Sequence, residues 1–223
     1  MLDPVTTTIL VSAGVLVVVD AWLENRRAMP PVPENIDINE ILAAHYRPCE
    51  ADRRLIGQCR QMLCITFGCK TAEQLERTIT EQMTPMTVDE RIAFIRTLAG
   101  QAAATLGVRL NDIKVEYTSA TYAGHYNIRR NTLHVNACAL CDRAYLAETV
   151  RTIFHELKHA VQAAAIRRDG NAWGYPVEVR AAWAHSMRNY IPASVDPYGY
   201  FHQPIEIDAF GFENSIVPHA GSH

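Results

Sequence analysis

The residues best suited to chemistry lie together in the segment RTIFHELKHAVQAAA. Within it, His155, Glu156 and His159 follow the pattern H-E-x-x-H. On an α-helix, residues i and i+4 lie one turn apart on the same face, so the two imidazoles can bind one metal ion from one side. Zinc is typical of this spacing, and Glu156 is then placed to act as general base toward a water molecule at the metal. The sequence therefore predicts one Zn²⁺ site on this helix.

A third metal ligand must come from elsewhere in the chain. A catalytic zinc ion normally has three protein ligands and one open coordination position. Two glutamates downstream are suitable: Glu178 follows Pro176, and Glu206 follows Pro204. Proline is common in the first turn of a helix, so both glutamates are expected early in a helix. Position alone does not choose between them.

The elements around the motif predict an α+β fold that is mainly helical, with a small sheet of about three strands next to the long motif helix. Alternating apolar and polar residues predict strands at 113–117, 121–128 and 132–136. Apolar residues at helical spacing predict helices at 35–46, 51–65, 71–83, 87–106, 142–168, 175–190 and 203–216. The segment 194–202 is expected to be an aromatic loop. Either 122–128 or 132–136 would offer a free strand edge to an extended peptide.

Two segments, TIFHELKHAVQ and QPIEIDAFGFE, resemble those of bacterial and phage zincin-like metallopeptidases of the gluzincin type. The resemblance covers residues 107–216 and does not extend to the N-terminal half. It implies that His155 and His159 are zinc ligands, that Glu156 is the general base, and that Glu206, rather than Glu178, is the third ligand.

The chain departs from the thermolysin-like pattern within that group. No Asp stands four residues after Glu206 or Glu178. The hydrogen-bond partner of a ligand histidine is therefore unassigned, and Asp208 and Gln162 are the candidates. Each also has a simpler interpretation, as a solvated polar residue of its helix.

Residues that stabilise a developing oxyanion are sought near the third ligand. The aromatic segment just before Glu206 offers Tyr198, Tyr200 and His202 as further catalytic candidates. His125 and Tyr126 are weaker candidates from the predicted strands.

The N-terminal 29 residues are treated as a separate hydrophobic segment. Residues 6–23 are almost long enough to span a bilayer, and the basic pair Arg26-Arg27 follows them. Two interpretations stay open: a membrane anchor with the main domain on the cytoplasmic side, or a buried element of the fold. A proline-rich stretch separates this segment from a helical region at 30–106, which precedes a zincin-like catalytic domain at 107–223.

Composition limits the partners and the compartment. The net charge is −3 and no large Lys/Arg cluster is present, which argues against nucleic-acid binding. The six cysteines, which include the CxxC pair Cys138 and Cys141, fit reduced thiols in a reducing compartment. We therefore expect a cytoplasmic protein, or one on the cytoplasmic face of a membrane, encoded by a bacterium or a phage.

Two functions follow from these observations. The first is a zinc metallopeptidase that hydrolyses protein or peptide substrates. The second is a zincin-fold binding or regulatory protein, whose zinc is structural or whose protease activity is lost. The geometry of the site discriminates between them, because an occluded metal or a Glu156 turned away from it favours the second.

Overall fold

The computed structural model describes residues 37–118, 123–167 and 171–219. In chain order, its elements are α2 (Ile38–His45), α3 (Glu50–Phe67), η1 (Ala72–Gln74), α4 (Leu75–Met83), α5 (Val88–Thr105), β1 (Asp112–Glu116), β2 (Gly124–Asn127), β3 (Thr132–Asn136), η2 (Ala137–Cys141), η3 (Arg143–Tyr145), α6 (Leu146–Ala165), α7 (Val177–Arg188), α8 (Pro197–Phe201) and α9 (Pro204–Ile216). The fold is α+β and mostly helical, with one small mixed sheet.

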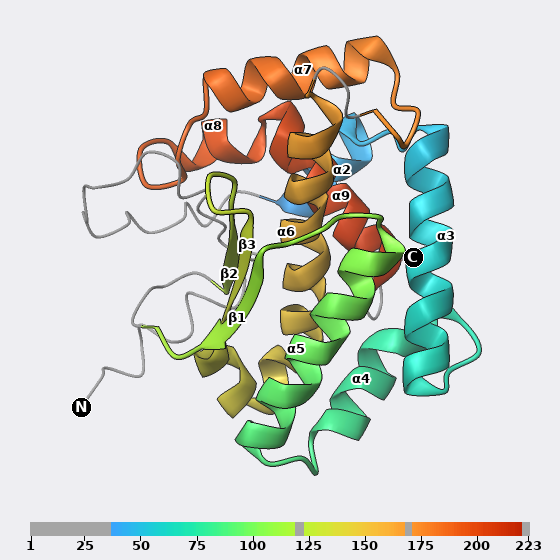
Figure 1. The fold of residues 1–223 in the computed structure, drawn as a ribbon. Helices are drawn as coiled ribbons and strands as arrows, with labels where there is room; N and C mark the ends of the chain where they lie inside the picture. Colours follow the sequence, from blue (N-terminus) through green and yellow to red (C-terminus); the bar gives the residue numbers. More distant parts are fainter. Residues whose placement is uncertain (1–36, 119–122, 168–170, 220–223) are drawn as a thin grey trace.

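Helix α6 is the centre of the molecule. Figure 1 shows it running through the middle, with the sheet on one side and α3 on the other. All its residues except Glu148 and Ala164 are buried. A helix buried all round is usually apolar, so each charged residue of α6 needs a partner in the interior. Helix α9 supplies many of these partners, because it packs along α6.

The sheet has the strand order β1-β3-β2. Strand β3 pairs in parallel with β1 and antiparallel with β2. Both β2 and β3 contact α6, whereas α5 covers β1. Since β3 is central, one of the two predicted free edges, 132–136, is wrong. The alternative, 122–128, contains the edge strand β2.

Most predicted elements are confirmed, with ends shifted by a few residues. Helix α5 begins with a capping box, in which the Glu90 carboxylate accepts a 2.7 Å hydrogen bond from the Thr87 backbone N–H. The expected aromatic loop is wrong in part, because Pro197–Phe201 forms the short helix α8. The Asp196 carboxylate caps that helix by accepting a 3.0 Å hydrogen bond from the Gly199 backbone N–H.

One hydrophobic core contains residues from both sides of the predicted boundary at 106/107. It joins Leu63 of α3 and Leu98 of α5 with Leu133 of β3 and Leu157 of α6. The division into 30–106 and 107–223 stays a prediction. The segment at 6–23 lies outside the described residues. Within the described part of the chain, no helix is long and apolar enough to cross a bilayer.

Candidate metal centre

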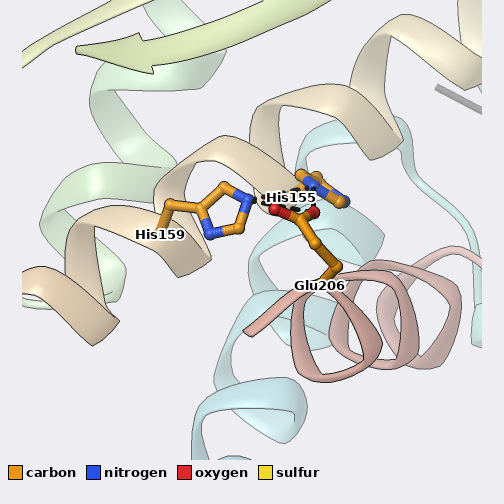
Figure 2. A group of neighbouring side chains, drawn as sticks. All are labelled: His155, His159 and Glu206. Carbon is orange, nitrogen blue, oxygen red and sulfur yellow. Dashed lines mark hydrogen bonds and ion pairs between the residues drawn. The ribbon is translucent and has the colours of Figure 1, made fainter. Parts of the chain in front are cut away.

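Helix α6 brings the two histidines of the motif together. The Nε2 atoms of His155 and His159 lie 3.1 Å apart, and their rings are nearly perpendicular. One helical turn separates the residues, so both side chains leave the same face of α6 (Figure 2). Both side chains are fully buried.

Glu206, in the first turn of α9, completes the group. Its Oε2 atom lies 3.3 Å from His155 Nε2 and 3.5 Å from His159 Nε2. Figure 2 shows its carboxylate pointing at the two imidazoles from the facing helix. These three residues are the only group of three or more potential ligands found in the described part of the chain.

The spacing of the three donor atoms fits a zinc ion. Ligand atoms at about 2.0–2.1 Å from a tetrahedral zinc are separated from one another by about 3.3 Å. The three observed separations of 3.1, 3.3 and 3.5 Å bracket that value. Two imidazole nitrogens and one carboxylate oxygen are also a ligand set that zinc takes in catalytic sites.

The outward-facing nitrogens of both histidines have partners of their own. His159 Nδ1 lies 2.8 Å from Gln162 Oε1, which confirms Gln162 as a hydrogen-bond partner of His159. His155 Nδ1 lies 3.4 Å from Glu213 Oε2. Asp208 contacts neither histidine in this way, and instead accepts a 2.7 Å hydrogen bond from Gln162 Nε2. Such outer contacts fix the ring orientation of a metal-binding histidine.

The sequence reading did not identify Glu213. The sequence spacing could have indicated Glu213, because it lies seven residues after Glu206 and therefore two turns along the same face of α9. The side chain of Phe210, on the same helix, packs against the His155 ring with 4.5 Å between ring centroids.

Charge in the site favours a cation between the three residues. Burial would lower the pKa of His155, but Glu206 and Glu213 outweigh it and raise that pKa to about 10. Burial would raise the pKa of Glu206, but His159 and His155 lower it to about 2. At His159, burial again acts to lower the pKa, but the Glu206 carboxylate outweighs it and the pKa of His159 is raised. The Glu206 carboxylate therefore stays ionised at neutral pH and attracts positive charge.

Glu156 lies beside this group without being part of it. Neither of its carboxylate oxygens makes a hydrogen bond of regular geometry within the described residues. Burial raises its pKa to about 7, although His155 and His159 act in the opposite direction. A carboxylate with a pKa near neutrality is suited to accept and return a proton.

Strand β2 lies directly over Glu156. A Cβ atom added at Gly124 would be 3.6 Å from Glu156 Cγ and 2.7 Å from Thr152 Cγ2. The backbone amide of Tyr126 also favours the charged form of Glu156. Glycine at 124 therefore allows the edge strand to approach the motif helix closely.

Of the three predicted candidates in the aromatic segment, only Tyr200 faces the site. Tyr200 is fully buried, and burial together with the charge of Glu206 raises the pKa of its phenol well above the usual value. Tyr198 is 63% exposed and its ring stacks on that of His202, 4.0 Å away. The structure thus separates Tyr198 and His202 from the group around Glu206.

The remaining candidates are not part of the group formed by His155, His159 and Glu206. Glu178 is exposed in the first turn of α7. The Tyr126 hydroxyl donates a 2.8 Å hydrogen bond to Asn131 at the β2–β3 turn. His125 stacks on His134 with 4.3 Å between centroids. Cys138 and Cys141 are exposed, and the described chain contains six free cysteines.

Access to the site is closed in this conformation. His155, Glu156, His159 and Glu206 each have 0% of their surface exposed. A substrate would reach them only after a movement of the surrounding elements, whereas a metal ion with a purely structural role would need no such opening.

Comparison of the chain with protein-family models, with curated protein sequences and with solved structures returned no match.

Proposed function

We propose that this protein is a zinc-dependent peptidase that uses His155, His159 and Glu206 as metal ligands and Glu156 as general base. The observation that carries the proposal is the spacing of the three donor atoms, at 3.1, 3.3 and 3.5 Å, with a second carboxylate, that of Glu156, beside them and outside the ligand group. A structural site needs no such spare carboxylate, and a hydrolytic site does.

The residues divide the chemistry among themselves. When bound, zinc supplies Lewis acidity, which polarises a carbonyl and lowers the pKa of water. Glu156 takes the proton of the attacking water and later donates it to the leaving amine. The Tyr200 hydroxyl, near Glu206, donates a hydrogen bond to the developing oxyanion. The edge strand β2 offers backbone groups to an extended protein or peptide segment.

The experiment combines metal content with hydrolysis. Purified wild-type protein should contain one zinc per chain, and Glu206→Gln should lose most of it. Glu178→Gln is the matched control, because it makes the same chemical change on an exposed residue early in a helix. Wild-type protein that takes up no zinc, or a Glu206→Gln variant that retains it fully, would refute the metal site.

Hydrolysis is then tested on casein and on a mixed peptide library. Glu156→Gln should retain zinc and lose cleavage by about 100-fold or more, since general-base catalysis contributes at least that much. Equal cleavage by both proteins would show that Glu156 is not the base.

A second candidate function is a zincin-like binding or regulatory protein with a structural metal. The complete burial of all four site residues favours it. It predicts that zinc raises the thermal stability of the protein while neither wild type nor Glu156→Gln cleaves any substrate.

A further inference from the structure

Lys158, a variable position inside H-E-x-x-H, is the most unusual buried group outside the proposed ligand set. Its side chain is 0% exposed, and its ammonium group forms ion pairs with two carboxylates in the interior. Lys158 Nζ contacts Asp52 Oδ1 of α3, Tyr175 Oη at 3.0 Å and Asp208 Oδ2 of α9 at 3.1 Å. The Tyr175 hydroxyl in turn donates a 2.8 Å hydrogen bond to Asp52. We refer to Asp52, Lys158, Tyr175 and Asp208 as the Lys158 cluster.

The Lys158 ammonium group has three oxygen partners, as many as it has donors: it donates hydrogen bonds to Asp52 and Tyr175 and forms an ion pair with Asp208. Three aromatic rings, those of Tyr175, Trp183 and Phe212, also lie 4.7–4.9 Å from Nζ. A buried ion pair of this kind adds little to stability over apolar residues of the same size, because removing the charges from water is costly. Stability alone therefore does not account for the charges.

One member of the cluster is connected to the metal site. Asp208 Oδ2 forms an ion pair with Lys158 Nζ at 3.1 Å and accepts a 2.7 Å hydrogen bond from Gln162 Nε2. Gln162 Nε2 also donates a 3.0 Å hydrogen bond to the backbone oxygen of Ile205, next to Glu206. Both partners of this nitrogen are acceptors, so it must be the NH₂ end of the amide.

The orientation of Gln162 decides the tautomer of His159. With its NH₂ end directed at α9, the carbonyl oxygen Oε1 faces His159 Nδ1 at 2.8 Å. An oxygen acceptor requires Nδ1 to carry the hydrogen, which leaves Nε2 as the ligand atom. Asp208, held by Lys158, and the Ile205 carbonyl oxygen together keep the amide from turning over.

We propose that Lys158, Asp208 and Gln162 form a positioning relay that fixes His159 as an Nε2 metal ligand. The relay rests on the proposed metal site. It makes the metal affinity depend on α3, because Asp52 from that helix completes the Lys158 cluster. Among the relay side chains, the one that is hydrogen-bonded to a proposed ligand is Gln162. Lys158 and Asp208 therefore act on His159 through Gln162.

The first test measures zinc affinity by competition with a chelator and the visible spectrum of the Co²⁺-loaded full-length protein. Gln162→Leu should weaken zinc binding by about 10–100-fold, the usual effect of losing such a partner, and should alter the Co²⁺ bands. Thr149→Val is the matched control: it removes another buried side-chain hydrogen bond on α6, that of the Thr149 hydroxyl to Tyr145 O at 2.8 Å. It should leave both readouts unchanged.

A pair of variants at Asp208 separates the relay from a general packing effect. Asp208→Asn keeps an oxygen that can accept from Gln162 Nε2, whereas Asp208→Leu has a side chain of similar size with no acceptor. Zinc affinity should stay within about threefold of wild type for Asp208→Asn and should fall by about tenfold for Asp208→Leu. Equal zinc affinities for the two variants would overturn the relay.

The role of Lys158 is tested by removing all three charges of the cluster. Lys158→Met with Asp52→Asn and Asp208→Asn leaves no unpaired charge in the interior. The metal-free variant should unfold close to the wild-type temperature, since buried ion pairs are replaceable, while zinc affinity falls by about tenfold relative to Asp208→Asn alone. Unchanged affinity would exclude Lys158 from the relay. Wild-type protein that binds neither Zn²⁺ nor Co²⁺ would refute the proposed function and the relay together, whereas equal binding by wild type and Gln162→Leu would refute the relay alone.

Discussion

Replacing Glu156 by Gln should stabilise the metal-free protein, and more so at high pH. Burial raises the pKa of Glu156 from 4.5 to about 7 in the folded state. For an acid whose pKa is raised by folding, stability is lost as pH rises from the unfolded value to the folded one. Glutamine keeps the shape of the side chain without a charge, so the variant does not undergo this loss.

The size of the effect follows from the two pKa values. At roughly 1.4 kcal/mol per pKa unit, ionisation of Glu156 costs about 3 kcal/mol at pH 8 and about 1 kcal/mol at pH 5. The stabilising effect of the substitution should therefore be about 2 kcal/mol larger at pH 8. In a chain of this length, that difference corresponds to about 4–8 °C in Tm.

The assay is thermal unfolding of wild type and Glu156→Gln at pH 5 and pH 8, with a chelator present throughout. Glu178→Gln serves as the control, because it removes an exposed carboxylate and should show no such pH dependence. An increase in Tm that is the same at both pH values, or a Glu156→Gln protein that is less stable at pH 8, would refute the reasoning.

Three further predictions concern the surroundings of Glu156. The pKa of Glu206 is lowered to about 2, so the stability that its carboxylate contributes above pH 4.5 is lost as the pH falls toward 2. In the metal-free Glu206→Gln variant, the free energy of unfolding should therefore depend less on pH in that range. Tyr200→Phe should lower kcat of the proposed peptidase by about 100-fold with little change in KM, and an unchanged kcat would remove Tyr200 from the mechanism. Gly124→Ala should destabilise the protein by about 1–3 kcal/mol, measured by urea unfolding, because the new Cβ would lie 2.8 Å from the His134 backbone oxygen, which cannot move aside.

Local patterns were sufficient for the parts of the site that one helix defines. The spacing of His155 and His159 predicts their common face, and burial of nearly all of α6 agrees with the apolar residues around them. Glu206 was preferred only through a resemblance, since Glu178 also follows a proline at the start of a helix. Tertiary packing separates the two glutamates: α9 lies along α6, whereas the first turn of α7 is open to solvent.

The aromatic segment shows why a loop prediction misplaced two candidates. Because Pro197–Phe201 is helical, Tyr198 and His202, four residues apart, stack on each other at one face, where Tyr198 is exposed. Tyr200 points the other way, into the interior. Glu213 and Asp52 were missed for a related reason, because which carboxylate meets which buried cation depends on how whole helices pack.

The Lys158 cluster has a consequence for how the chain can change over evolution. A five-letter motif treats the third and fourth positions of H-E-x-x-H as free, but Lys158 is bound to two carboxylates on two other helices. A lone substitution at this position would leave unpaired negative charge in the interior. Related chains without a lysine here should therefore also have neutral residues at the positions of Asp52 and Asp208, and the three positions should vary as a set.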